Sequence, residues 1–239
     1  MMQQRVVRSE GFTLIELMIT MLISGFIISA IYGAYMTQNR VYIAQEEVVE
    51  MQQNIRATLV ALTRDIQMAG YDLTGTASTG FINGDTFSDG TTNVAVLSDN
   101  DEIAFTVDLD GDGVIDQIAE DTNGDGNVDI TEMEQIAYRL NGTDLERYST
   151  LSGTGTWVTV AEQIERIEFQ YLDGDENVTA DMDEVKLVKI SLLARVGRPD
   201  LKFLNSRTYT SSGGIAWAVN DNYRRRYLIT SILCRNMGG

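Results

Sequence analysis

Ten carboxylates gather in one segment of the chain, residues 108–134, which contains no lysine or arginine. At that density, uncompensated negative charges repel one another unless a cation lies among them. Calcium binds to oxygen ligands, and carboxylates are prominent among them. The sequence therefore predicts a cation-binding segment, whose acidic residues are Asp108, Asp110, Asp112, Asp116, Glu120, Asp121, Asp125, Asp129, Glu132 and Glu134.

The second half of this segment, residues 121–132, matches the calcium-loop pattern D-x-[DN]-x-[DN]-G-x5-E at every specified position. Gly126 supplies the sharp turn that the pattern requires, and Glu132 supplies a bidentate carboxylate. Asp129 is predicted to contact the ion directly or through water. The remaining predicted ligands are the side chains of Asp121, Asn123 and Asp125 and the backbone carbonyl of Asn127.

A first loop begins in the same way thirteen residues earlier, but its twelfth position is Ala119, and Glu120 comes one place late. This loop lacks the usual bidentate ligand, so it binds calcium more weakly or is completed from elsewhere. Clear amphipathic helices do not flank the two loops, which predicts calcium loops set in a β-hairpin. The alternative is a solvated acidic turn without an ion. The candidate ligands of the first loop are Asp108, Asp110, Asp112 and Asp116.

Two later acidic segments, residues 173–177 and 181–184, lack the ligand spacing and are predicted to be turns.

The composition excludes several classes of function. The 239 residues include no histidine, the commonest general base and a frequent zinc ligand. No serine or cysteine nucleophile with a base and no phosphate-cradling loop is recognisable, so the chain is predicted not to be an enzyme. The net charge of −17 repels phosphate backbones, and direct nucleic-acid binding is not expected. The single cysteine, Cys234, excludes an intramolecular disulfide.

A short charged leader meets a long apolar run at residues 11–17, Gly-Phe-Thr-Leu-Ile-Glu-Leu. The 24 residues from 12 to 35 carry no charge except Glu16. A helix of that length reaches about 36 Å and crosses a hydrocarbon core of about 30 Å. A carboxylate in lipid is costly unless it has a partner, so Glu16 is a candidate functional residue.

The sequence Gly-Phe-Thr-Leu-Ile-Glu resembles the processing site of type IV prepilins and of the related pseudopilins of type II secretion. The resemblance implies that a prepilin peptidase cuts between Gly11 and Phe12 on the cytoplasmic side of the membrane and methylates the new terminus, Phe12. It also implies that Glu16 pairs with the terminal ammonium of a neighbouring subunit in a fibre, which offsets part of the desolvation cost of both charges. Cleavage removes two of the 18 basic and one of the 35 acidic residues, leaving a net charge of −18. An ordinary anchor with a snorkelling glutamate is the alternative.

Apolar residues continue with helical spacing beyond the anchor. Val41, Val48, Ile55 and Leu62 recur every seven residues, and an adjoining row predicts one buried helical face. That row consists of Ala44, Met51, Leu59 and Ile66. Gly70 is a plausible C-cap. The predicted organisation is a cleaved leader at 1–11, a transmembrane assembly helix at 12–35, its amphipathic continuation at 36–69, and a β-rich globular domain at 70–239.

Downstream, the helical period gives way to alternating β-branched and aromatic residues bounded by Gly, Asp and Asn clusters. The runs are 103–107, 135–140, 164–172, 185–196 and 225–235, and together they predict an antiparallel sheet. One long helix followed by strands favours an α+β fold, with the helix packed on the sheet.

Residues 134–142, 168–173, 223–227 and 235–236 resemble the PilW-type minor pilins. The resemblance implies a pilin-like fold and a minor pilin of a type IV pilus, acting in assembly, in initiation or at the tip. Its partners would be the prepilin peptidase and, through the N-terminal helix, other major and minor pilins. It would lie in the inner membrane as a single-pass protein and then in the fibre, the periplasm or the cell surface. The alternatives are a J-type pseudopilin of a type II secretion system and a calcium-dependent adhesion or binding module on a fibre.

Overall fold

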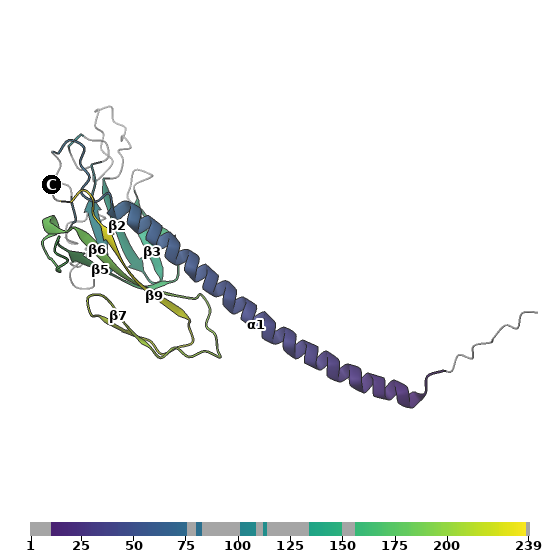
Figure 1. Ribbon diagram of the computed structural model, residues 1–239. Helices are drawn as coiled ribbons and strands as arrows, with labels where there is room; N and C mark the ends of the chain where they lie inside the picture. Colours follow the sequence, from purple (N-terminus) through teal and green to yellow (C-terminus); the bar gives the residue numbers. More distant parts are fainter. Residues whose placement is uncertain are drawn as a thin grey trace, which may run out of the picture. The chain divides into compact units, whose positions relative to one another are not determined.

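The computed structural model describes residues 11–75, 80–82, 101–108, 112–113, 134–149 and 156–237 (Figure 1). The chain divides into two compact units, Met1–Glu46 and Glu47–Gly239. Helix α1, Leu14–Ile66, contributes residues to both units, and all the strands belong to the second.

In the first unit, α1 exposes apolar side chains on every side. Phe26, Ile28 and Tyr32 are all more than 60% exposed, and the most apolar stretch of the helix has a mean hydropathy of 2.3 with no buried residue. A helix that is apolar all round fits a lipid environment. By length and composition, α1 can cross a membrane, as the sequence predicted.

In the second unit, α1 becomes amphipathic, and its apolar face enters the protein core. Met51, Ile55, Leu62 and Ile66 are buried, and Val48 and Leu59 pack against them, as the sequence predicted. Val41, which is 52% exposed, and Ala44, which is only partly buried, are the exceptions, because the buried face of the helix begins only at Val48.

The helix ends at Ile66, and residues 67–70 form a tighter turn that closes at Gly70. Gly70 has a φ of +74°, a left-handed conformation that suits glycine. Its amide donates a hydrogen bond to the carbonyl of Thr106, and a Cβ here would lie 2.6 Å from Met237 Sδ. Gly70 therefore ends the helical segment and fits closely against the C-terminal residues.

The strands of the described residues form three antiparallel sheets (Figure 1). The strand order is β1-β2-β3-β4 in the first sheet and β5-β6-β9 in the second. The third sheet pairs β7 with β8. The first sheet consists of β1 (Ile103–Thr106), β2 (Gln135–Asn141), β3 (Asp144–Ser149) and β4 (Thr156–Ala161). The others consist of β5 (Ile164–Leu172), β6 (Leu187–Arg195), β7 (Thr208–Thr210), β8 (Ala216–Ala218) and β9 (Arg225–Leu233), with a short 3-10 helix, η2 (Met182–Glu184), before β6.

The predicted α+β fold is confirmed, but the five predicted strand runs do not share one sheet. The first two become β1 and β2, and the other three become β5, β6 and β9 of the second sheet. The division falls between β4 and β5, where Gln163 takes a positive φ of 63°. This is a turn conformation, so the chain leaves one sheet and begins the next.

Both larger sheets and the second half of α1 share one hydrophobic core, which includes Leu62, Phe105, Tyr138, Phe169 and Ile190. Figure 1 shows the last turns of α1 beside β2 and β3. The described part of the chain therefore has a helix packed on antiparallel sheets.

A buried carboxylate links α1 to the first sheet. Asp65 Oδ2 accepts hydrogen bonds from Tyr138 Oη on β2 and Arg147 Nε on β3, both at 2.7 Å. Arg64 Nε, which is largely exposed, donates to the other oxygen at 2.9 Å. Burial raises the pKa of Asp65, but these hydrogen bonds and the charge of Arg147 outweigh burial and hold the pKa below its usual value.

A second buried carboxylate, Glu168 on β5, holds the segment that joins β7 to β8. Its oxygens accept hydrogen bonds from the hydroxyls of Ser211 at 2.8 Å and Ser212 at 3.2 Å and from the amide of Gly213 at 3.1 Å. Gly213 is needed for this approach, since a Cβ there would lie 2.4 Å from Glu168 Oε1. The small hairpin is therefore anchored to the second sheet by a buried acid.

Candidate functional site

Gly11, Phe12 and Thr13 precede the first turn of α1. Phe12 is 85% exposed, and a Cβ added at Gly11 would meet no atom within 4 Å. The peptide bond between them, which is the predicted cleavage site, is therefore open to an enzyme within the described part of the chain.

Thr13 and Glu16 form a capping box at the start of α1. Glu16 Oε2 accepts hydrogen bonds from the Thr13 amide at 2.9 Å and from the Thr13 hydroxyl at 2.7 Å. In return, the Glu16 amide donates to Thr13 Oγ1 at 3.3 Å. This reciprocal arrangement satisfies amides that the first helical turn leaves unpaired. The helix dipole also stabilises the negative charge of Glu16 at the helix N-terminus.

Thr13 is a residue whose role the sequence interpretation did not identify. The prediction gave Glu16 a partner from another subunit, whereas the structure gives it a partner in its own chain. The signal was present, because Thr-x-x-Glu before an apolar run is the sequence signature of a capping box. Both hydrogen bonds from Thr13 go to Oε2, and no described residue donates a hydrogen bond to Oε1.

Two further threonine hydroxyls of α1 also have local partners. Thr20 Oγ1 donates to the Leu17 carbonyl at 2.9 Å, and Thr37 Oγ1 donates to the Gly33 carbonyl at 3.0 Å. Bonding of this kind within one helix lets threonine lie in an apolar environment. The segment thus combines a lipid-compatible surface with one carboxylate at its beginning.

The acidic segment connects two paired strands. Strands β1 and β2 are antiparallel, with Ile103 opposite Tyr138 and Thr106 opposite Gln135, and the Val107 amide donates to the Glu134 carbonyl at 2.7 Å. β1 and β2 therefore pair as the two strands of a hairpin, as the sequence predicted, and most of the residues that connect them lie outside the described part of the chain. Asp108 is buried at the base of the hairpin, where its amide donates to the Tyr71 carbonyl at 2.9 Å.

Most predicted calcium ligands lie outside the described residues. These are Asp110, Asp116, Asp121, Asn123, Asp125, Asn127, Asp129 and Glu132. Of the first loop, Asp108 and Asp112 are described, and the described residues alone bring together no group of three side chains that could hold a metal ion. Calcium binding stays a prediction.

The later acidic segment at 173–177 is a turn, as predicted. Asp173 Oδ1 accepts hydrogen bonds from the amides of Asp175 at 2.9 Å and Asn177 at 2.8 Å, and Glu176 has a φ of 63°. These hydrogen bonds lower the pKa of Asp173, the bond from the Asn177 amide having the largest effect. Its carboxylate has a local structural role.

Comparison with known proteins finds two matching family models. The prokaryotic N-terminal methylation motif matches residues 7–32, and prepilin peptidase-dependent protein B matches residues 44–212, more than half of the chain. No curated protein matches the chain. Among solved structures, a type IV-like pilin from Thermus thermophilus is 16% identical, with 79% of this chain and 98% of that chain covered and a TM-score of 0.46. The motif match confirms the prepilin-type N-terminus that Gly11, Phe12 and Glu16 predicted.

Proposed function

The chain belongs to the prepilin peptidase-dependent protein B family, and from this membership we propose that it is a minor pilin of a type IV pilus. The observation that carries the proposal is the methylation motif at residues 7–32, followed by a helix apolar enough to cross a membrane. In this proposal the chain is first a single-pass protein of the inner membrane. A prepilin peptidase then cuts it after Gly11 and methylates Phe12, and the mature subunit enters the fibre.

The proposed assembly step uses the charge that cleavage creates. Hydrolysis of the bond before Phe12 replaces an amide by an amine, which is positively charged at neutral pH. In the fibre, this ammonium of one subunit lies beside the Glu16 carboxylate of its neighbour. The arrangement at Thr13 supports the proposal, because the described residues engage Glu16 Oε2 and leave Oε1 for the incoming charge. An ion pair inside a helix bundle offsets part of the desolvation cost of both groups.

The acidic hairpin is proposed to bind calcium. The spacing of Asp121, Asn123, Asp125, Asn127, Asp129 and Glu132 supports this, as does the closure of the segment by β1 and β2. A bound cation would relieve the repulsion among these carboxylates and stiffen the hairpin. A stiffened loop is of most use where the fibre meets a partner or a surface, which supports a place at the tip or in the initiating assembly.

Mass spectrometry of the protein recovered with sheared fibres tests the proposed function. The expected N-terminus is Phe12 with one added methyl group, and Gly11→Val should leave the leader attached. A mature terminus beyond the apolar run would contradict the pilin proposal. Recovery of the processed chain only with the type II secretion machinery, and not with pili, would identify it as a J-type pseudopilin.

A further inference from the structure

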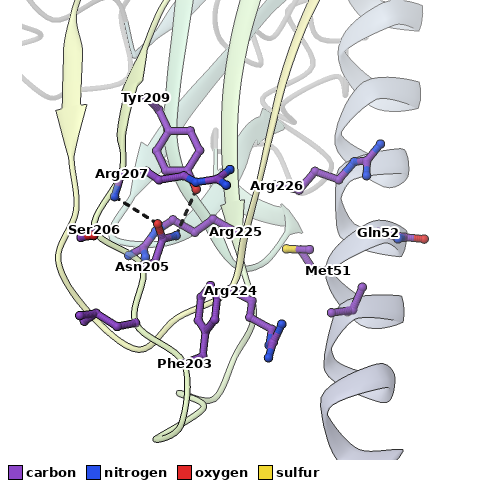
Figure 2. A pocket seen from close by; sticks show the side chains of 12 residues that line it. Met51, Gln52, Phe203, Asn205, Ser206, Arg207, Tyr209, Arg224, Arg225 and Arg226 are labelled. Atoms are coloured by element: carbon purple, nitrogen blue, oxygen red, sulfur yellow. Dashed lines mark hydrogen bonds between the residues drawn. The ribbon is translucent and has the colours of Figure 1, made fainter. Parts of the chain in front are cut away.

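A pocket of about 450 Å³ lies in the second unit between α1, the segment 203–209 and the start of β9 (Figure 2). Four arginines line it: Arg207, Arg224, Arg225 and Arg226. The whole chain has only 18 basic residues against 35 acidic ones. Such a concentration of guanidinium groups on an acidic protein requires a specific explanation.

Two of these arginines are held by internal carboxylates. The Arg225 guanidinium is only 1% exposed and forms bidentate ion pairs with Asp221, at 2.6 and 2.7 Å, and with Glu165. The hydrogen bonds from Arg225 lower the pKa of Asp221 to about 2. Arg224 pairs with Asp200 at 2.8 Å and lies over the ring of Phe203 at 4.5 Å. Asp200, Asp221 and Glu165 thus compensate the charges of these two arginines.

The other two arginines are exposed and lack such partners. No described residue accepts a side-chain hydrogen bond or ion pair from Arg207 or Arg226. Figure 2 shows Arg226 extending from β9 toward the side of α1, and Arg207 extending from its loop toward β9. A guanidinium presents a planar set of donors that matches a carboxylate with two parallel hydrogen bonds. The pocket thus offers two uncommitted carboxylate receptors.

The pocket continues into an elongated groove. A second hollow of about 630 Å³ shares Arg207, Arg225 and Arg226 with the first and extends to Thr208 and Tyr227. The groove therefore follows β9 from residue 224 to residue 227, a distance of about 10 Å for an extended chain. In an extended peptide, alternate side chains point to the same side, about 7 Å apart.

We propose that this groove binds an acidic peptide segment of a partner protein, with its carboxylates on Arg207 and Arg226. The proposal does not depend on assembly into a fibre, because every residue of the groove belongs to the unit Glu47–Gly239. A short peptide is favoured over a nucleic acid because Asp200, Asp221 and Glu165 already pair with Arg224 and Arg225 of the groove and the chain has a net charge of −17. This field opposes a long polyphosphate, whereas two guanidinium groups suffice for two carboxylates.

Fluorescence anisotropy with the full chain in detergent tests the proposal. The probe is a fluorescein-labelled decapeptide of alternating glutamate and serine, and the comparison probes replace glutamate by glutamine or are single-stranded DNA of ten nucleotides. The double variant Arg207→Gln/Arg226→Gln should bind the glutamate peptide at least tenfold more weakly than the wild type. Arg166→Gln/Arg235→Gln, which removes the same charge from exposed sites outside the groove, should change the affinity less than twofold.

A second pair of variants guards against a loss of folding. Arg207→Glu/Arg226→Glu should lose the glutamate peptide and bind the matching lysine peptide more tightly than the wild type does, while the circular dichroism spectrum stays that of the folded chain. Equal affinity for the glutamate and glutamine peptides, or equal losses in the groove and control variants, would overturn the proposal. Tighter binding of the DNA than of the glutamate peptide would assign the groove to nucleic acid instead.

Discussion

Glu16 combines two roles that can be separated by mutation. Its carboxylate caps its own helix through Thr13, and in the proposed fibre it receives the amine of a neighbouring subunit. Thr13→Ala removes the capping hydroxyl but keeps the carboxylate, whereas Glu16→Ala removes both functions. Loss of an N-cap costs about 1 kcal/mol of helix stability, and membrane insertion favours the apolar Glu16→Ala variant.

Glu16→Ala is therefore expected to insert normally but to enter fibres poorly, while Thr13→Ala enters them nearly as well as the wild type. Quantitative immunoblots of membrane and sheared-fibre fractions measure both quantities. Equal incorporation of the two variants would show that pairing by Glu16 has no part in assembly.

The buried carboxylate of Asp65 forms ion pairs with Arg64 and Arg147, and the side chains of these two arginines differ in solvent exposure. The Arg147 side chain is 22% exposed, the Arg64 side chain is 71% exposed, and the Asp65 side chain is 2% exposed. Removing one partner of a buried pair leaves an uncompensated charge, whereas an exposed pair contributes little. Arg147→Gln should lower the free energy of unfolding by about 2–4 kcal/mol, and Arg64→Gln by less than about 1 kcal/mol. Urea denaturation at pH 7 measures both, and equal losses would contradict this account.

The effect of Arg147→Gln should also depend on pH. Because the pKa of Asp65 is lower in the folded chain than in the unfolded chain, its stabilising contribution is complete above the unfolded value of about 3.9. It is lost as the pH falls through the folded value. The difference in stability between the wild type and Arg147→Gln should therefore shrink below about pH 3.9. A difference that stays constant from pH 7 to pH 3 would show that Arg147 acts through packing and not through charge.

At the scale of single residues, local patterns were predictable and long-range polar contacts were not. Gly11, Phe12 and Glu16 belong to one short motif. The capping role of Thr13 was detectable from its spacing to Glu16. Asp65 gave no such signal, because its partners on β2 and β3 are 73 and 82 residues away in the sequence.

The hairpin β7–β8 depends on one buried acid for its attachment to the second sheet. Glu168→Ala removes the acceptor of three donors from residues 211–213 and should lower stability by about 1–3 kcal/mol. Hydrogen exchange should rise first in residues 208–218 and much less in the sheet β1–β4. Glu162→Ala, in an exposed turn, is the matched control and should leave exchange unchanged. A uniform rise throughout the second unit would show that Glu168 supports the core as a whole.

Among the elements, the predicted strand runs became β1, β2, β5, β6 and β9, whereas β3, β4, β7 and β8 were missed. β5, β6 and β9 each span nine residues with strong β propensity. β7 and β8 have three residues each, too few for a periodic signal. β3, Asp144–Ser149, contains three charged residues but lies inside the first sheet. One reason is that Arg147 donates a hydrogen bond to Asp65 on α1. That pairing exists only in the folded chain.

At the scale of the whole molecule, the order of elements was enough to predict the α+β class, since a long helix precedes every strand. The division into sheets was not predictable, because it depends on which strands pair. The arginine groove illustrates the same limit, since residues 48–52, 203–209 and 224–226 meet only after folding. A predicted calcium loop is the opposite case, because all its ligands lie within twelve residues of the sequence and their spacing alone makes the prediction.

Calcium binding by the acidic hairpin should therefore be measurable as a gain in the stability of the full chain in detergent. A ligand that binds only the folded form stabilises it by RT ln(1 + [L]/Kd), which is about 1.4 kcal/mol at 1 mM calcium for a Kd of about 10⁻⁴ M. Asp125→Ala/Glu132→Ala should abolish most of this gain. Asp173→Ala/Asp175→Ala should lower stability equally with calcium and with chelator, because Asp173 accepts hydrogen bonds from its own turn. Titration calorimetry without heat of binding, together with a melting temperature unchanged by chelator, would show that the hairpin is a solvated acidic loop.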